Sequence, residues 1–335
     1  MHVASLVSDG ADADAVVVDE GVSVSGGHDP WSDSKLANVV YHDWESTTYD
    51  DKWSISFDDR CVSYAQDVLH KIAPGISTPV EVAVEFGSGT GFFLLNLMQS
   101  GLAKRGIVTD ISSGMVRAAV DHGHQLGLNV DGVACDAEGL PLADASVDLV
   151  IGHAVLHHIP HIDAALREIL RVLRPGGSFV IAGEPTTWGD RIARNLSRAT
   201  WWATTQAMRI PGFPAAYVRD PESLAHMSEE AALESVVDLH TFDPDRLAAA
   251  AMRAGAVDVR TRTTEFSAAW FGWPVRTFEA AMPPGVLGFG WANFAYRTWQ
   301  RLYALDHSIV EKFVPQRFFY NVSITGVRPA FPAAR

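Results

Sequence analysis

The sequence of 335 residues has only two cysteines, Cys61 and Cys135, and it lacks any apolar run of the ~18 residues that a membrane-spanning helix requires. Two cysteines cannot form a disulfide framework, and they are typical of a protein in the reducing cytoplasm. A basic segment followed by an apolar core, which would indicate a secretion signal, is also missing from the first residues. We therefore expect a cytoplasmic protein with no membrane span.

Positive charge is scarce as well. The chain has 26 Lys and Arg residues against 40 Asp and Glu residues, which gives a net charge of −14 and a pI near 5.3. A protein that binds nucleic acid usually presents a basic surface to the phosphates, and no cluster of Lys and Arg stands out here. We therefore expect no nucleic-acid partner. The hydrophobic content of 47% is that of a globular protein, long enough for one large core with a cap or for two small domains.

Large side chains other than valine are rare in residues 1–30, where Ala, Asp, Gly, Ser and Val predominate. This composition predicts a flexible leader. The character changes at residues 31–77, where tyrosines and tryptophans stand among acidic and polar residues. Within this segment we predict a helix at residues 57–72, because a Pro-Gly pair follows it closely.

From residue 78 to residue 185, apolar runs of strand length alternate with segments of helical length. This alternation predicts β-α-β units and a mostly parallel sheet with helices on both faces. Ligands bind such sheets at the carboxyl ends of the strands. Across the whole chain the predicted strands are 82–86, 106–109, 132–135, 147–152, 178–182, 257–264 and 318–327, and the predicted helices after residue 90 are 92–101, 113–126, 162–173 and 244–254.

Two Trp-rich segments, residues 186–240 and 266–316, interrupt the alternation, and we predict that they are helical cap insertions. The core resumes at residues 241–265 with a helix and a strand, and at residues 317–335 with a last strand and a tail. The sequence therefore predicts an α/β fold with appended caps. Cap tryptophans can line a pocket, form the core of the cap or lie in a homodimer interface, and the sequence leaves these alternatives open.

The segment VAVEFGSGTGFF at residues 82–93 carries the most specific signal. Glycines after a buried strand permit a tight turn and let a ligand approach the backbone closely. A dinucleotide-binding loop reads GxGxxG, but here the glycines follow GxGxG and Phe92 stands where the third glycine would be. Glu85, two residues before the first glycine, would repel a pyrophosphate and attract a cation. The loop therefore predicts a nucleoside ligand that carries positive charge.

Four stretches, taken in order, resemble the class I S-adenosylmethionine-dependent methyltransferases. Each stretch alone is a weak signal, but their order and separation are specific. The resemblance implies a Rossmann-like, mostly parallel seven-stranded sheet with an antiparallel last strand, and it implies S-adenosyl-L-methionine as the cofactor. The four stretches are EFGSGTG (85–91), VTDIS (108–112), ACDAEGLPLADASVDLVIGHAVLHHI (134–159) and LREILRVLRPGGSFVIAGEP (166–185).

The resemblance also implies where the cofactor would be bound. Asp110 would accept hydrogen bonds from the ribose hydroxyls, and Asp136 would accept one from the adenine amine beside the backbone of Ala137. Ile111 and Met115 would sandwich the adenine ring. The methionyl end would lie beside the remaining predicted residues, which are Glu85, Gly87, Ser88, Gly89, Gly91 and His153.

Members of the family often carry a lid over the cofactor, and residues 31–77 occupy the corresponding place in this sequence. We predict that this segment forms lid helices. Tyr41 and Tyr49 would then close on the methionine and on the substrate. Simple packing of these two side chains against the sheet is the alternative.

Methyl transfer is an in-line displacement, so the protein must align the nucleophile, exclude water and remove a proton where the acceptor carries one. Histidine is the natural base near neutral pH. Candidate catalytic residues are His153, His157 and Glu184, at the ends of the fourth and fifth predicted strands. Packing or capping roles are the alternatives, and an acceptor that ionises easily needs no base. Because no acidic ligand set accompanies the HHxxH spacing, we predict no metal.

The leading interpretation is a methyltransferase that acts on oxygen, nitrogen or carbon of a hydrophobic small-molecule acceptor, including secondary metabolites. A lipid or quinone acceptor is a variant of this function. A non-methylating binding or rearrangement protein on the same scaffold is the alternative, since fold does not fix chemistry. A dinucleotide oxidoreductase is disfavoured by Phe92 and Glu85.

Overall fold

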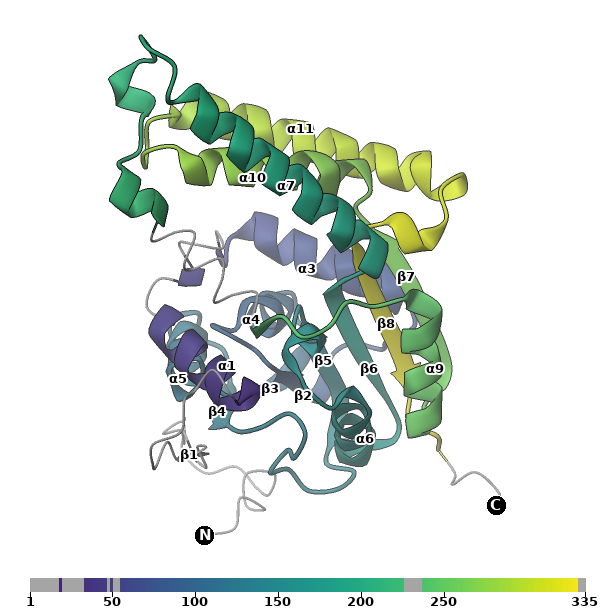
Figure 1. The fold of residues 1–335 in the computed structure, drawn as a ribbon. Coiled ribbons are helices and arrows are strands. Elements are labelled where there is room, and N and C mark those ends of the chain that lie inside the picture. Colours follow the sequence, from purple (N-terminus) through teal and green to yellow (C-terminus); the bar gives the residue numbers. More distant parts are fainter. Residues whose placement is uncertain (1–17, 20–32, 47–48, 51–54, 226–236, 331–335) are drawn as a thin grey trace.

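The computed structural model describes residues 18–19, 33–46, 49–50, 55–225 and 237–330. These residues form one eight-stranded sheet with the strand order β1-β4-β3-β2-β5-β6-β8-β7 (Figure 1). Apart from β1, the leader predicted for residues 1–30 lies outside the described residues. The strands are β1 (Val18–Asp19), β2 (Val80–Phe86), β3 (Ala103–Asp110), β4 (Val130–Ala134), β5 (Val147–His153), β6 (Leu173–Pro185), β7 (Val257–Thr264) and β8 (Asn321–Val327).

Strands β1 to β6 pair in parallel, whereas β8 is antiparallel to both of its neighbours, β6 and β7. The predicted mostly parallel sheet with an antiparallel last strand is confirmed. Strand β1 is an addition at the edge, and its two residues are too few to give a periodic pattern. The last strand begins at Asn321 rather than at residue 318, because Gln316–Phe318 form a turn of 3-10 helix, η6.

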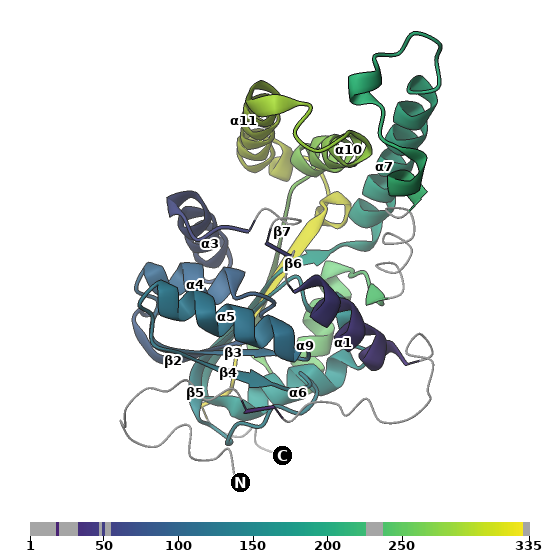
Figure 2. The same ribbon diagram turned by 90° about the vertical axis from the view of Figure 1, so that its left-hand side faces the viewer.

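Helices cover both faces of the sheet, as Figures 1 and 2 show. Side chains of α3, α4 and α5 pack on one face, and those of α6 and α9 pack on the other. Helix α1 packs on the outside of α5. The bounds are α1 (Ser34–Glu45), α3 (Asp59–Ile72), α4 (Phe92–Gln99), α5 (Ser113–Gln125), α6 (Ile162–Val172) and α9 (Pro244–Ala254).

Strand β2 shows why the sheet is covered on both faces. Val82, Val84 and Phe86 pack in the core beneath α6 and α9, whereas Ala83 packs in the core beneath α3, α4 and α5. Successive side chains of a strand point to opposite faces, so an unbroken apolar run requires apolar cover on both. Because the strand is central, its carboxyl end and the loop that follows lie in the middle of the molecule.

Three further helices form a separate layer beyond the carboxyl end of β6, as Figures 1 and 2 show: α7 (Thr187–Ala207), α10 (Ser267–Ala281) and α11 (Gly288–Ser308). We call this layer the cap. Helix α10 packs against both α7 and α11. Large apolar side chains of this region remain exposed, including Trp202 at 67% and Phe289 at 86%. Among the described helices, none is both long enough and apolar enough to cross a membrane.

Candidate active site

A cavity of about 640 Å³ lies at the carboxyl ends of β2, β3, β4 and β5. Its walls come from the sheet, from α1 and from α3, α10 and α11. Many of the predicted site residues line this cavity: Tyr49, Glu85, Gly87, Ser88, Gly89, Asp110, Ile111, Asp136, Ala137 and His153. The parallel strands bring these residues together, because their carboxyl ends meet at one edge of the sheet.

The loop between β2 and α4 has a left-handed backbone at each of its three glycines. At Gly87 the angle φ is +57°, and a Cβ atom there would stand 2.0 Å from Cγ2 of Val155, which follows β5. A contact that short would force the loop away from the cavity wall. Glycine is therefore required at this position by both backbone conformation and space.

Replacing Gly87 with alanine should destabilise the protein by about 3 kcal/mol, since overpacking and left-handed strain each cost roughly 1–3 kcal/mol. Urea unfolding would measure the loss. The matched control is Gly75→Ala, because a Cβ atom at Gly75 meets nothing within 4 Å. Adding Val155→Ala to the Gly87 variant should restore part of the stability. Equal stability of the two glycine variants would contradict the requirement at Gly87.

The carboxylate of Asp110 closes the turn between β3 and α5. Its Oδ2 accepts a hydrogen bond from the backbone N–H of Gly89 at 2.9 Å, and its Oδ1 accepts one from Ser112 at 2.9 Å. The side chain is fixed in place, and each oxygen retains acceptor capacity. Burial raises the pKa of Asp110 to about 6, although the backbone hydrogen bonds oppose the shift.

Ligand binding at this site should therefore depend on pH. If hydroxyl groups of a ligand donate to the Asp110 carboxylate, protonation removes an acceptor, and affinity should fall as pH drops through about 6. Below that pH the loss can reach about tenfold per unit. Calorimetry with S-adenosylmethionine between about pH 8 and pH 5 would test this dependence. An affinity that stays level, or that rises toward low pH, would contradict it.

Glu85 is buried beside the glycine loop, with 1% of the residue exposed. Its Oε2 accepts a hydrogen bond from the backbone N–H of Leu94 at 2.9 Å, at the start of α4. Burial raises the pKa of Glu85 well above its usual value, and the nearby Asp110 adds to the shift. A cation in the cavity would favour the ionised form, so this wall of the cavity suits a positively charged ligand.

The third carboxylate of the cavity, Asp136, forms an ion pair with Lys35 of α1. Its Oδ2 lies 2.5 Å from Lys35 Nζ, and the same ammonium group lies 2.7 Å from Glu138 Oε2. At the other end of α1, Asp43 accepts hydrogen bonds from the hydroxyl of Ser112 and from the backbone N–H of Gly114. Helix α1 is thus fastened over this end of the cavity at two points.

Sequence reasoning missed Lys35, although it lines the cavity. The residue is 101 positions from Asp136 and belongs to no periodic pattern, so no local signal marks it. Tyr49 lines the cavity as the lid hypothesis requires. Tyr41 instead packs with Ala37 and Val237, away from the cavity.

His153, at the end of β5, lines the cavity within an aromatic cluster. Its ring centroid lies 5.1 Å from that of Phe93 and 5.6 Å from that of Phe92. Burial lowers the pKa of His153 to about 4, so the ring is neutral and a weak base at pH 7. Its Nε2 is buried near Gly183 and finds no hydrogen-bond partner among the described residues. This environment argues against the predicted role of His153 as a general base.

His157 and the buried Glu184 form a pair that does not line the cavity. Glu184 is fully buried, and its carboxylate accepts hydrogen bonds from the backbone N–H groups of Val155, Leu156 and His157 at 2.8, 2.9 and 3.1 Å. Its Oε2 also lies 2.9 Å from Nδ1 of His157. The geometry therefore makes Glu184 an anchor for the loop after β5, in place of the predicted contact with a substrate.

Two other predicted cofactor residues also lie outside the cavity wall. Gly91 adopts a left-handed conformation and begins α4, where a Cβ atom would meet Leu95 at 2.6 Å. Met115 is buried in the first turn of α5, with 1% of the residue exposed. Gly91 and Met115 therefore lie in the elements next to the cavity, but neither residue lines it.

The far wall of the cavity comes from helices outside the parallel core. Tyr64 of α3, Arg276 of α10, and Tyr296 and Trp299 of α11 line it. Burial raises the pKa of Tyr64 above its usual value, so its phenol stays protonated and can donate a hydrogen bond. The Trp-rich composition of the insertions left open whether their aromatic residues line a pocket, and it did not show which of them face inward.

Comparison with known proteins identifies the family. A sequence model described as a methyltransferase domain matches residues 84–181. The chain is 32% identical to the ubiquinone/menaquinone biosynthesis C-methyltransferase UbiE of Rubrivivax gelatinosus over 180 residues, which are 53% of this chain and 69% of that protein. The chain belongs to the class I S-adenosylmethionine-dependent methyltransferases.

Two other matches are more partial or more distant. The malonyl-[acyl-carrier protein] O-methyltransferase of Methylococcus capsulatus is 30% identical over 177 residues, covering 50% of this methyltransferase and 62% of the relative. The structure of the [4+2]-cyclase SpnF has a TM-score of 0.53 at 17% identity, with 89% of this chain and 97% of that chain covered. The second likeness shows a shared fold.

The cavity of this methyltransferase fits S-adenosylmethionine, the cofactor of its family. That molecule carries a sulfonium, an ammonium and two ribose hydroxyls. Among the residues that the structure describes, three carboxyl groups line the cavity, from Glu85, Asp110 and Asp136, beside a glycine loop in which Gly87 has no room for a side chain. Carboxyl groups beside the glycine loop match a cationic nucleoside and would repel a pyrophosphate.

Proposed function

We propose that this protein transfers the methyl group of S-adenosylmethionine to oxygen, nitrogen or carbon of a hydrophobic small molecule. The observation that carries the proposal is the shape of the cavity. A single space joins the carboxylates of the sheet to the aromatic wall of α3 and α11. Its volume of about 640 Å³ falls in the range of roughly 300–1,000 Å³ that small-molecule sites occupy.

In the cofactor half, Asp110 would accept from the ribose hydroxyls, and Glu85 would face the methionyl ammonium. Asp136 would accept a hydrogen bond from the adenine amine, and Ile111 and Ala137 would lie beside the ring. Asp136 would keep its ion pair with Lys35. Tyr49 would cover the methionine end near Gly89, since its ring lies 3.5 Å from the place of a Cβ atom there. The cofactor would supply a methyl group on a positively charged sulfur, and the neutral thioether S-adenosylhomocysteine would be the leaving group.

In the acceptor half, the chain's own residues would orient the acceptor and exclude water. Tyr64 offers a hydrogen-bond donor, the indole of Trp299 offers an apolar face because its N–H is bound to Glu265, and Arg276 adds a cation to the lining. Because His153 is a weak base and neither His157 nor Glu184 lines the cavity, none of the three predicted bases is placed to remove a proton from an acceptor efficiently. The favoured acceptor therefore ionises easily or presents an activated carbon.

Two measurements test the proposed function. Calorimetry should show that S-adenosylmethionine binds, and incubation with metabolite extracts should yield S-adenosylhomocysteine together with a product heavier by one methyl group. Mass spectrometry would identify that product. Tight cofactor binding without S-adenosylhomocysteine across acceptor classes would count against methyl transfer.

A second candidate function keeps the cofactor without methyl transfer. The shared fold with a protein described as a [4+2]-cyclase favours considering a rearrangement, and so does the placement of the three predicted bases, His153, His157 and Glu184. In that case product would form while the cofactor remained unconsumed. Isotopically labelled methyl groups separate the two functions, because label enters the product only in methyl transfer.

A quinone or lipid acceptor is a variant within the same class of hydrophobic acceptors. The UbiE relative and the exposed apolar side chains of the cap, such as Phe289, support this variant. Sedimentation with liposomes would separate it from a water-soluble acceptor. A protein that stays in the supernatant at every lipid composition would disfavour membrane-embedded acceptors.

A further inference from the structure

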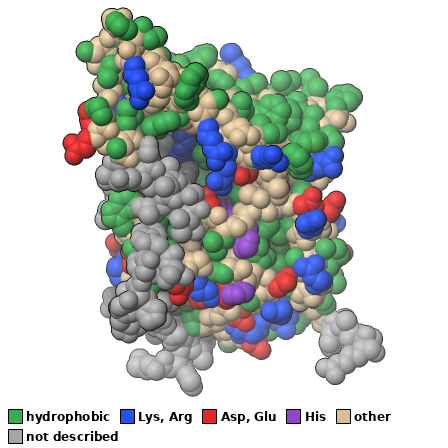
Figure 3. All heavy atoms as spheres, in the orientation of Figure 1, with side chains coloured by type: hydrophobic (Ala, Val, Ile, Leu, Met, Phe, Trp, Pro, Cys, Tyr) green, Lys and Arg blue, Asp and Glu red, His purple; other side chains and the backbone are tan. Residues whose placement is uncertain are grey.

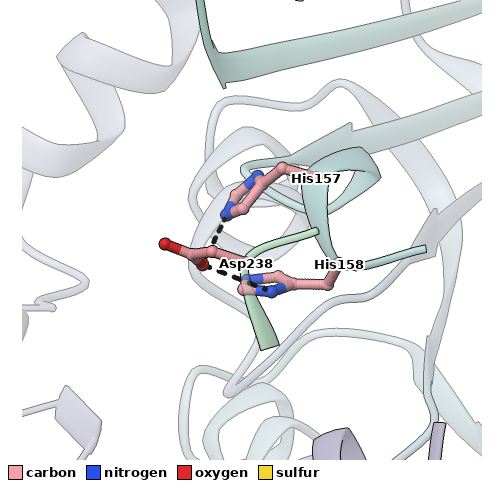
Figure 4. Close-up of side chains that lie close together, drawn as sticks. All are labelled: His157, His158 and Asp238. Carbon is pink, nitrogen blue, oxygen red and sulfur yellow. Dashed lines mark ion pairs between the residues drawn. The ribbon is translucent and has the colours of Figure 1, made fainter. Parts of the chain in front are cut away.

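A group of three metal-binding side chains lies beside the cavity and has no part in the proposed methyl transfer. His157 and His158 follow β5 in a turn of 3-10 helix, η3 (Leu156–His158), and Asp238 comes from the segment that leads to α9. Figure 4 shows the three side chains converging. One ligand atom from each can be chosen so that all three atoms lie within 4.8 Å of one another.

Glu184 fixes the orientation of the His157 ring through its Nδ1 atom. Its Nδ1 lies 2.9 Å from Glu184 Oε2, and Glu184 is held in turn by three backbone N–H groups. With the Nδ1 proton donated to Glu184, the lone pair of Nε2 faces Oδ1 of Asp238 at 3.8 Å. A buried carboxylate that orients an imidazole in this way is the usual outer partner of a metal-binding histidine.

His158 and the backbone of residue 237 complete the group. Nδ1 of His158 lies 3.6 Å from Asp238 Oδ1 and donates a hydrogen bond to the carbonyl oxygen of Val237 at 3.0 Å. A bound ion would take the place of this proton, and the imidazole would then carry its proton on Nε2. Neighbouring ligands around an ion bound at ~2.0–2.2 Å lie roughly 3–3.5 Å apart. The two spacings to Asp238 Oδ1, 3.8 and 3.6 Å, are only slightly longer than this range.

Charge at the site also favours a cation. Oδ1 of Asp238 faces both imidazoles, and Oδ2 faces Arg194 at 3.5 Å. Arg194 is bound more closely to Asp190, at 2.7 and 2.9 Å, and the partners of Asp238 Oδ1 are the two imidazoles. The side chains of His157, His158 and Asp238 are 12, 21 and 24% exposed, which leaves a path for an ion. Figure 3 shows histidine side chains at the surface on this face, below the cap.

We propose that His157, His158 and Asp238 form a binding site for a divalent transition-metal ion. Two imidazoles and one carboxylate suit zinc, nickel or copper and are poor ligands for magnesium or calcium. The ion would join two segments 80 positions apart, the loop after β5 and the segment before α9. Val155 and His158 also line the cavity. A bound ion would therefore stabilise the part of the cavity wall that these residues form. This role does not depend on the acceptor.

The test uses untagged full-length protein that has been stripped with a chelator and dialysed. Zinc titration by calorimetry should show one equivalent bound, and elemental analysis after gel filtration should show the same stoichiometry. Asp238→Asn and His158→Gln should each weaken zinc binding at least about tenfold. These two substitutions keep side-chain size and spare the contact between His157 and Glu184. Cobalt absorption should report imidazole ligation in the wild type and change in both variants.

His161→Ala is the matched control, because His161 follows on the same segment but faces Glu138 at 3.0 Å and not Asp238. It should bind zinc as the wild type does. Zinc should also raise the melting temperature of wild type and of the control, but not that of Asp238→Asn. Absence of a stoichiometric site, or equal zinc affinity in wild type and Asp238→Asn, would overturn the proposal. The three side chains would then be only a charged, hydrogen-bonded group.

Circular dichroism of each variant would check that it is folded.

Discussion

Replacing Asp110 with asparagine should weaken S-adenosylmethionine binding about 100-fold. Each hydrogen bond to an ionised group contributes roughly 1.5–3 kcal/mol, and about 1.4 kcal/mol corresponds to a factor of ten. The amide would lose one acceptor oxygen and the negative charge. It would also compete poorly for the backbone N–H groups of Gly89 and Ser112, which the carboxylate now holds. Calorimetry at neutral pH measures the change.

The control for this variant is Asp144→Asn, an exposed carboxylate that pairs with Arg171 far from the glycine loop. It should bind the cofactor as the wild type does. Urea unfolding of both variants separates lost binding from lost fold. An Asp110→Asn protein that is folded and binds with unchanged affinity would contradict the assignment of Asp110 to the ribose.

Replacing Glu184 with alanine should destabilise the protein by about 4 kcal/mol or more. The carboxylate is fully buried and accepts from three backbone N–H groups and from the ring of His157. Each buried donor left without an acceptor costs roughly 1–3 kcal/mol. Thermal and urea unfolding would measure the loss. Glu184→Gln retains one acceptor oxygen and should lie between the wild type and the alanine variant.

The same pair of variants distinguishes an anchor from a catalytic base. An anchor predicts that stability falls in the order wild type, glutamine, alanine, and that residual activity of the folded glutamine variant keeps the pH profile of the wild type. A base predicts unchanged stability, a large loss of turnover in the glutamine variant and an altered pH profile. The second pattern would return Glu184 to the catalytic role that its position in the sequence suggested.

The sheet and the glycine loop could be predicted from sequence because their signals are local. The apolar run of β2, the glycines after it and the acid at the end of β3 lie within about 30 residues of one another, the span of one β-α-β unit. Each of these signals is set by the conformation of its own segment. The seven predicted strands follow from the same local alternation of apolar runs and helical segments. Strand β1 was not predicted, because its two residues are too few to show a periodic pattern.

The directions of individual side chains could not be predicted in the same way. Met115 and Tyr41 were expected at the cofactor, yet both are buried elsewhere. Successive helix residues are rotated by about 100°, so a shift of one or two positions changes the face that a side chain occupies. His157 and Glu184 were expected at the substrate, but the path of the loop after β5 turns them toward each other. The path of a loop depends on hydrogen bonds between distant segments, and the periodicity of the sequence gives no sign of them.

The sequence by itself therefore determined the fold, the family and the chemistry of the cofactor end, since strand period, glycine conformation and strand-end acids are properties of short segments. Only the tertiary structure decided that Lys35 reaches Asp136, that Trp299 and Tyr296 face the cavity, and that Asp238 meets His157. These residues come from segments separated by tens to hundreds of positions. Packing of the cap and of α1 on the sheet brings them together, and that packing has no counterpart in any local pattern.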